Sequence, residues 1–354
     1  MKVYRVSLPS LPSLPHLRAR LSIALVVATG LLAQYGCDGL AEADPDLAAR
    51  TPTAARQALL TASSAREIYR GLAAALVQDD AYYFVGIAAD EMAGTPGGLL
   101  RIERADTSKQ LVLSEQGQYP VGLALDTTDV YVADMFAGTV ARLPKTGGAP
   151  RVLVSGLDAP SSVFVDAKNV YFTTASAVRR VPKGGGAITT IATRQDSPGD
   201  VVADGKYVFW STYTSVVRAP LAGGPSVVIA RASGAVPGIA IDTSTVYFID
   251  NPAYGLTGVV KSIPKVGGKV SVVASEQAIP MDLAVDGTNV YWANSALADL
   301  YTDAGSVVRW SKGAASPVTV ADAQWAPMVV SARGGNVAWI AQGEDMIPTV
   351  LVLE

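Results

Sequence analysis

The residues best suited to chemistry in this 354-residue chain are acidic and aromatic side chains in four long segments between expected strands. These segments span 86–97, 251–257, 295–305 and 342–347. Together with one connecting segment they supply Asp90, Glu91, Tyr254, Asp299, Tyr301, Asp303, Trp325, Glu344 and Asp345. Carboxylates beside aromatic rings suit a cationic peptide, a glycan or a hard cation bound by oxygen atoms. The alternative is that they are solvated loops without a ligand.

Catalysis that needs histidine or cysteine has few residues available. The only histidine is His16 and the only cysteine is Cys37, and both precede the expected folded domain. Serine or cysteine nucleophiles paired with histidine, and zinc sites of histidine and cysteine, are therefore excluded from that domain. Hydrolysis by carboxylates alone, or a calcium-dependent lactonase reaction, stays open. We predict no catalytic residue, no metal ligand and no cofactor, with calcium as the alternative.

One aspartate recurs at a fixed position, at the end of an expected first strand. The set is Asp126, Asp166, Asp204, Asp242 and Asp286. A ring of carboxylates could hold a metal, but an aspartate before a turn also accepts hydrogen bonds from backbone amides two residues on. We predict the turn role. Likewise, we expect Trp210, Trp292 and Trp339 to pack between repeats and not to hold a cofactor.

These residues stand in a repeated frame of two short strands and a tight turn, clearest at 280–294 (PMDLAVDGTNVYWAN). The other copies span 120–134, 160–174, 198–212 and 236–250, with weaker ones at 71–85 and 327–341. With the tyrosine of VYW as reference, the equivalent in the first copy is Tyr82. Repeats of about 40 residues with several short strands predict four-stranded β-propeller blades.

Within the third copy, alternation and turn residues place strands at 161–166, 169–174, 177–181 and 187–192. The segment PKGGG at 182–186 predicts a hairpin turn, because proline cannot donate a hydrogen bond to a strand ladder. A phosphate loop would have to be followed by a helix, and none is expected here.

The last copy has only three strands before the chain stops, at 328–332, 336–341 and 348–354. We predict that the segment 56–61 (RQALLT) supplies the fourth and closes a ring of seven blades. Six or eight blades are the alternatives, and 51–70 could instead be helical. Closure makes the four long segments neighbours, so they would form one wall around the central opening.

The strings VYWAN, VYFTT, VFWST, VYFID and VYVAD resemble the YWTD motif of low-density-lipoprotein-receptor propellers, and the unit is similar to NHL-type and streptogramin-lyase-like propellers. The resemblance covers about residues 56–354 and implies propeller architecture. It implies no particular partner, because such relatives include receptors, scaffolds and a few enzymes.

The amino terminus is typical of export. Residues 1–36 contain Lys2, Arg5, Arg18 and Arg20, no acid, and an apolar run at 21–32 that is too short to span a bilayer. Cys37 follows in AQYGCDG, which resembles a bacterial lipoprotein cleavage site. We therefore expect a signal peptide at 1–36, lipidation of Cys37, a flexible tether at 37–55 and one propeller at 56–354. Cleavage after Ala43, which would release a soluble secreted or periplasmic protein, is one alternative, and an uncleaved anchor is another.

Removal of residues 1–36 takes four of the 28 basic residues and none of the 31 acidic ones, leaving 24 against 31 and a net charge of −7. This charge gives no footprint for nucleic acid or anionic lipid. We expect an extracytoplasmic monomer, attached to the membrane only by its lipid. Its function would be non-catalytic binding of a peptide, protein or glycan through the rim loops. An envelope-assembly scaffold and a carboxylate- or calcium-dependent hydrolase are the alternatives.

Overall fold

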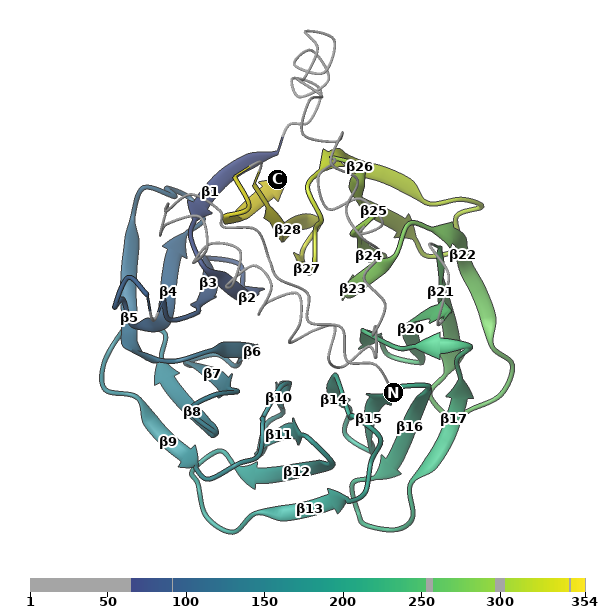
Figure 1. The fold of residues 1–354 in the computed structure, drawn as a ribbon. Helices are drawn as coiled ribbons and strands as arrows, with labels where there is room; N and C mark the ends of the chain where they lie inside the picture. The colour runs from purple at the N-terminus through teal and green to yellow at the C-terminus, as the bar shows by residue number, and fades with distance from the viewer. Residues whose placement is uncertain (1–64, 91, 253–256, 297–302, 344, 354) are drawn as a thin grey trace, which may run out of the picture.

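Seven antiparallel sheets stand side by side in a closed ring in the computed structural model (Figure 1). The structure describes residues 65–90, 92–252, 257–296, 303–343 and 345–353. Within these residues every regular element is a strand. The predicted seven-bladed β-propeller is confirmed.

The first four blades follow one another along the chain, each running from the innermost to the outermost strand. The first contains β2 (Ala73–Gln78), β3 (Tyr82–Ile87), β4 (Gly97–Glu103) and β5 (Gln110–Gly117). The second contains β6 (Pro120–Leu125), β7 (Asp129–Asp134), β8 (Thr139–Pro144) and β9 (Arg151–Val154). The third contains β10 (Val163–Val165), β11 (Asn169–Thr174), β12 (Ala177–Pro182) and β13 (Thr189–Ala192). The fourth contains β14 (Val201–Ala203), β15 (Tyr207–Thr212), β16 (Ser215–Pro220) and β17 (Val227–Arg231).

The last three blades complete the ring. The fifth contains β18 (Gly234–Ala235), β19 (Ile239–Ile241), β20 (Thr245–Pro252), β21 (Gly258–Pro264) and β22 (Ser271–Gln277). The sixth contains β23 (Pro280–Asp286), β24 (Asn289–Asn294), β25 (Gly305–Ser311) and β26 (Val318–Gln324). The seventh contains β27 (Val329–Arg333), β28 (Asn336–Gln342), β29 (Pro348–Leu353) and, outermost, β1 (Arg66–Arg70). Two separate segments, β18 and β19, both pair with β20, so the fifth sheet has five strands.

Closure of the ring comes from β1, which pairs antiparallel with β29 from Arg66 opposite Val352 to Arg70 opposite Thr349. The prediction that an amino-terminal strand completes the last blade is confirmed, but its position at 56–61 was wrong. The pairing strand lies further along the chain, and 56–61 is outside the described residues. Because Arg66–Arg70 is extended, the helical alternative for this part of 51–70 is also wrong.

Other boundaries follow the repeat closely. In the third blade the observed strands begin and end within two residues of the predicted ones, and β11 coincides with 169–174. The PKGGG segment is a hairpin turn, with Gly185 and Gly186 at φ values of 81° and 126° that glycine adopts readily. The reference tyrosine was misplaced in the first blade, where Phe84 pairs with Arg101 as Tyr131 pairs with Arg142.

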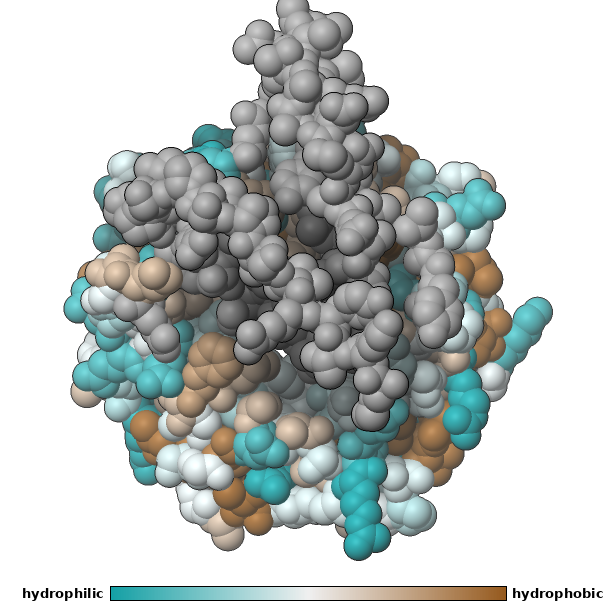
Figure 2. Space-filling model, viewed as in Figure 1, coloured by the Kyte–Doolittle hydropathy of each residue, from teal (hydrophilic) through white to brown (hydrophobic). Residues whose placement is uncertain are grey.

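The core lies between blades and not at one centre. Each second strand buries nearly every residue, as in the NVYFTT of β11, because both faces of a blade are covered by neighbours. Several apolar side chains that stay exposed, such as Val152, Val272 and Val318, belong to outermost strands. Hydrophobic and hydrophilic residues alternate around the outer part of the face in Figure 2. In the part of the chain that the structure describes, no helix could cross a bilayer.

Candidate ligand site in the central channel

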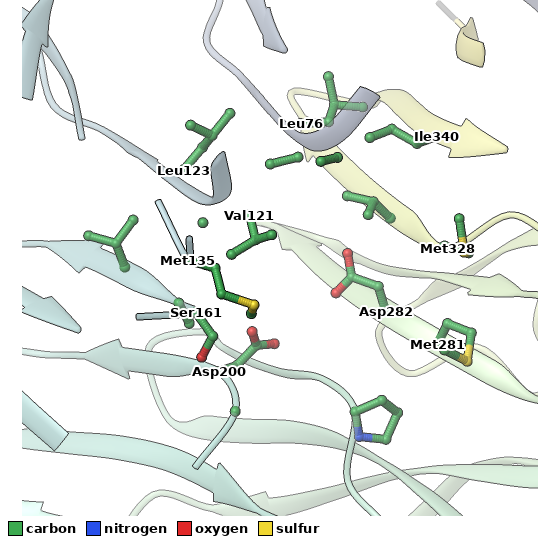
Figure 3. A pocket seen from close by; sticks show the side chains of 18 of the residues that line it. Leu76, Val121, Leu123, Met135, Ser161, Asp200, Met281, Asp282, Met328 and Ile340 are labelled. Carbon is green, nitrogen blue, oxygen red and sulfur yellow. The ribbon is translucent and has the colours of Figure 1, made fainter. Parts of the chain in front are cut away.

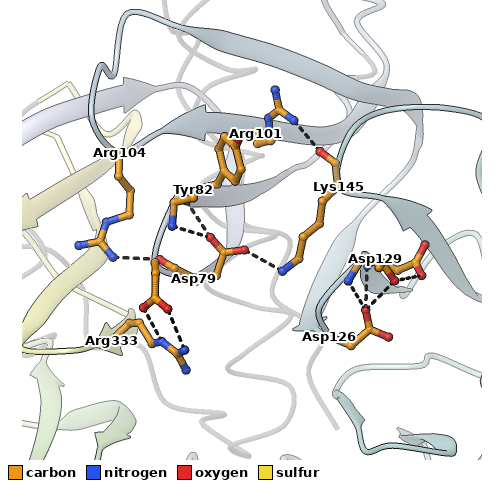
Figure 4. Close-up of polar contacts among 11 residues, drawn as sticks. Asp79, Tyr82, Arg101, Arg104, Asp126, Asp129, Lys145 and Arg333 are labelled. Atoms are coloured by element: carbon orange, nitrogen blue, oxygen red, sulfur yellow. Dashed lines mark hydrogen bonds and ion pairs between the residues drawn. The ribbon is translucent and has the colours of Figure 1, made fainter.

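The recurring aspartates hold their own turns, as predicted. Asp126 Oδ1 accepts hydrogen bonds from the backbone amides of Thr128 and Asp129, both at 2.8 Å (Figure 4), and its Oδ2 accepts one from the Tyr131 hydroxyl at 2.9 Å. Lys183 of the next blade forms an ion pair with the same carboxylate. Burial favours the neutral acid, but the hydrogen bonds from Lys183 and the backbone amides outweigh it and hold the pKa of Asp126 well below its usual range.

Ion pairs of this kind tie neighbouring blades together at one face of the ring. Each joins an aspartate at a first turn to a lysine in the third-to-fourth hairpin of the following blade. The other members are Asp79–Lys145 at 2.7 Å, Asp204–Lys265 at 3.0 Å and Asp242–Lys312 at 2.8 Å. Figure 4 shows the Asp79–Lys145 pair reaching between two blades. These carboxylates have structural partners, as the turn role predicts.

The three tryptophans are core residues, as expected. Trp210, Trp292 and Trp339 are each fully buried between two blades, and each indole N–H donates to a glutamine fifteen residues earlier. The acceptors are Gln195 at 2.9 Å, Gln277 at 2.8 Å and Gln324 at 2.9 Å. A buried indole N–H needs such a partner.

The candidate rim residues fall into two groups. Those outside the described residues are Glu91, Tyr254, Asp299, Tyr301 and Glu344. The described ones are Asp90, Asp303, Trp325 and Asp345. The loops that carry them join the second to the third strand in blades one, five, six and seven, and the last strand of blade six to blade seven. These blades are consecutive in the ring, because the sixth contacts the seventh and the seventh contacts the first.

The described rim carboxylates are engaged within the protein. Asp90 Oδ1 accepts the amides of Met92 and Ala93, both at 3.0 Å, which shapes its own loop. Asp345 pairs with Arg70 at 3.1 Å and caps its own turn. Asp345 and Trp325 line one cavity of about 400 Å³ beside the closing strand. Asp303 lies two residues before β25. The rim site as a whole stays a prediction.

A second set of carboxylates lies at the centre of the ring. Asp200, directly before β14, and Asp282, on β23, both line a cavity of about 260 Å³ that we call the channel cavity. Its wall includes strands or connections from all seven blades, among them Leu76, Val121, Ser161 and Ile340. Both carboxyl groups turn into the same space (Figure 3). Asp200 also lines a second, wider opening, at the face of the ring where the turn aspartates lie.

Backbone amides of the following blades hold both side chains in place. Asp200 Oδ2 accepts a hydrogen bond from Ile239 N at 3.2 Å, and Asp282 Oδ2 accepts one from Val330 N at 2.9 Å. The equivalent Ser162 Oγ accepts one from Val201 N at 3.2 Å. The positions are equivalent because each lies four residues before the point where the first strand turns. The carboxyls are therefore fixed by the ring itself.

Electrostatics distinguishes these carboxyls from those at the turns. Burial raises the pKa of Asp200 and of Asp282, and the negative charge of Asp200 raises the pKa of Asp282 further. Both groups keep some contact with water because they face the channel. Among the described residues that line the channel cavity there is no lysine, arginine or histidine. The pair therefore has no protein cation beside it in this cavity.

Apart from Ser161 and Ser162, the side chains in the rest of the wall are mostly apolar and flexible. Met135, Met281 and Met328 line it, together with the ring of Tyr119, whose pKa burial raises to about 12, so the phenol stays neutral. Phe136 stacks on Tyr119 with ring centroids 4.9 Å apart and is 57% exposed. Methionine adapts to irregular ligand shapes, and the exposed ring of Phe136 adds apolar surface beside Tyr119. This arrangement can accept an apolar group that ends in a positive charge.

Our sequence prediction did not include Asp200 or Asp282. The signal was present, since the positions four residues before the turn aspartates hold Gly122, Ser162, Asp200, Gly238 and Asp282. Two acids among small residues at one frame position would have marked the channel. Groups of three or more histidine, cysteine, aspartate or glutamate residues able to hold a metal are not found in the described ranges. The calcium alternative gains no support from this finding.

The sequence matches no protein-family model and no curated protein sequence. Among solved structures, the fold is similar to a streptogramin B lyase, with a TM-score of 0.63, 10% identity, and coverage of 81% of this chain and 96% of the other. It is similar to a hydrazine synthase of Kuenenia stuttgartiensis, with a TM-score of 0.58, 15% identity, and coverage of 79% and 95%. A computationally designed protein also matches, with a TM-score of 0.54, 13% identity, and coverage of 80% and 97%. At these identities the likeness concerns the fold alone, and on that basis the chain is a β-propeller.

Proposed function

We propose that the chain is an exported, non-catalytic binding module that takes a small ligand, or the side chain of a larger one, into the channel cavity. The observation that carries this proposal is the pair of carboxyls, Asp200 and Asp282, facing a mostly apolar cavity that has no basic residue among its described lining. An apolar pocket with a few convergent polar groups and perturbed pKa values is the usual form of a binding site.

The ring provides the rigidity that such a site needs. Each carboxyl is fixed by an amide of the next blade, so little conformational entropy is lost when a ligand binds. The rim residues of the sequence prediction, with Trp325 and Asp303 among those described, would then contact the part of a peptide, protein or glycan that stays outside the cavity. The channel cavity supplies specificity and the rim adds contact area.

A substitution that fills the cavity tests this proposal. Val121 lines the channel cavity, and Val121→Trp should block it, whereas Val152→Trp on β9 adds the same ring to an exposed position. We screen a library of small amines and peptides for members that raise the melting temperature of the wild-type protein and of V152W. We expect these members to leave the melting temperature of V121W unchanged. Library members that stabilise V121W as well as wild type would place the site elsewhere, and the proposal would fall.

The module is proposed to act in the cell envelope as a monomer with a lipid on Cys37. The basic and apolar character of residues 1–36 and the Gly36–Cys37 junction support this. Cys37→Ala should move the protein from the membrane fraction to the soluble fraction of the envelope. Unchanged fractionation would refute the lipid anchor without affecting the binding proposal.

Acid–base hydrolysis by the same pair is the second candidate. Two interacting carboxyls whose pKa values differ can serve as acid and base, and the repulsion from Asp200 on Asp282 favours such a division. A hydrolase would turn over a glycoside or lactone and lose that turnover in Asp282→Asn. If compounds bound in the cavity are recovered unchanged after prolonged incubation, binding is the function.

A further inference from the structure

The charge of the channel cavity restricts what can fill it. Its two ionisable acids, Asp200 and Asp282, are accompanied by Tyr119, whose phenol is neutral, and by no basic side chain. A negatively charged ligand would add to the repulsion between the two carboxylates, whereas a positively charged ligand would relieve it. The cavity therefore selects for positive charge.

Space for that charge lies in the cavity that both acids line. Asp200 belongs to the fourth blade and Asp282 to the sixth, and the equivalent residue of the fifth blade is Gly238. A Cβ atom at Gly238 would lie 3.4 Å from Asp282 Oδ1, so any side chain there would border this carboxyl. Glycine keeps the space beside the Asp282 carboxyl free of a side chain.

The remaining wall fits an apolar arm. Met135, Met281 and Met328 present thioethers, which pack against flexible alkyl chains, and Tyr119, on which Phe136 stacks, adds an aromatic surface. A volume of about 260 Å³ exceeds the roughly 150 Å³ that holds a benzene molecule and is below that of a typical drug site. A ligand of side-chain size fits.

We propose that the channel cavity binds a primary alkylammonium group, with the ammonium between Asp200 and Asp282 and the alkyl arm against the methionines. This inference rests on the proposed binding function and adds the chemical class of the ligand. Three hydrogen bonds from one ammonium can reach two carboxyls at once, which a neutral hydroxyl cannot match.

Calorimetry with three probes of equal length tests the charge requirement on the full propeller. We expect n-hexylammonium to bind about tenfold or more tightly than hexan-1-ol at pH 8, and hexanoate to bind least. In Asp200→Asn/Asp282→Asn the preference for the cation should disappear while hexan-1-ol binding persists. Melting curves of the double variant confirm that it is folded.

The outcomes separate this inference from the binding proposal. If hexan-1-ol or hexanoate binds wild type as tightly as the cation, and V121W abolishes that binding, the cavity is a ligand site but the ammonium class is wrong. If none of the probes binds, the inference also falls, and the library comparison of V121W with V152W decides the binding function independently. Retention of cation preference in the double variant would equally overturn the inference.

The source of the ammonium group is tested with peptides. Acetyl-Ala-Lys-Ala-amide should bind about as tightly as n-hexylammonium if a protein lysine enters from the mouth, whereas tenfold weaker binding points to free amines. The norleucine analogue, which lacks the charge, is the control. It should not bind, whether the natural source of the ammonium group is a protein lysine or a free amine.

Discussion

Asp282 and Asp286 stand four residues apart on β23, yet the fold uses them in opposite ways. Asp286 faces a turn, where its oxygens accept the amides of Asn289 at 3.1 Å and of Gly335 at 2.7 Å and the hydroxyl of Tyr291 at 3.3 Å. Asp282 faces the channel cavity, with a like charge nearby and no basic residue in the lining. The same side chain is a structural anchor at one position and an unmatched charge at the other.

This difference gives the two sets of acids opposite effects on stability. Four turn acids, Asp126, Asp166, Asp204 and Asp242, have lowered pKa values, about 2 for Asp242. Their stabilisation is present above the unfolded value near 4 and is lost as pH falls through the folded value. The channel acids have raised pKa values, so their contribution is present below the unfolded value and is lost as pH rises through the folded ones. Anchors stabilise the protein at neutral pH, and the channel pair destabilises it there.

Removing an anchor should have the largest effect. Asp126→Ala deletes the acceptor of two backbone amides and of Tyr131, and it leaves Lys183 without its ion-pair partner. Hydrogen bonds to charged groups contribute about 1.5–3 kcal/mol each. The contributions of bonds to one carboxylate do not simply add, so we expect a loss of about 3 kcal/mol of unfolding free energy. Urea denaturation at pH 7 measures it.

The control for this prediction is Asp322→Ala, which removes an exposed carboxylate from β26 and should change stability by less than about 0.5 kcal/mol. Equal losses in D126A and D322A would show that the turn acids are not anchors.

The anchors could be predicted from the sequence because their partners are local. Asp126 reaches residues two, three and five positions ahead, so the repeat itself displays the motif. The amides that fix Asp200 and Asp282 from the next blade are 39 and 48 residues away, although Asp282 also accepts the amide of Leu283, and the two acids come to one cavity only through the ring. Sequence periodicity fixes the blade but does not show which positions of different blades face one cavity.

The misplaced closing strand has a related cause. β1 buries only Ile68, because an outermost strand has one neighbour and a solvent face, so its alternation is weak and its ends are charged. The segment RQALLT looked more like a strand by composition. The pairing of β1 with β29, two segments far apart in the sequence, determines which segment completes the blade.

Neutralising one channel acid should have an intermediate effect of opposite sign. Asp282→Asn keeps an oxygen for Val330 N but removes the charge that Asp200 repels. Since one pKa unit corresponds to about 1.4 kcal/mol, we expect a gain of about 1–2 kcal/mol at pH 8 and none below pH 4. Thermal unfolding from pH 4 to 9 measures this slope.

Asp286→Asn, on the same strand, is the matched control for that variant. It presents an amide group to the donors from Asn289 or Gly335, so it should lose stability at pH 8 where D282N gains it. A loss of stability in both variants would show that Asp282 is an anchor like Asp286, and the contrast between turn and channel would not hold.

The smallest effect comes from adding an anchor that the ring lacks. Asp166 accepts the amides of Lys168 and Asn169 and the Tyr171 hydroxyl, all at 2.7 Å, as Asp126 does, but the next hairpin has Leu221 where the others have lysine. Leu221 N bonds to Lys206 O just as Lys183 N bonds to Lys168 O, so the backbone there already has the required position. Leu221→Lys should keep the aliphatic packing and gain about 0.5 kcal/mol in urea denaturation. Leu221→Met, which adds no charge, should gain nothing, and a gain in L221K that survives high salt would not come from an ion pair with Asp166.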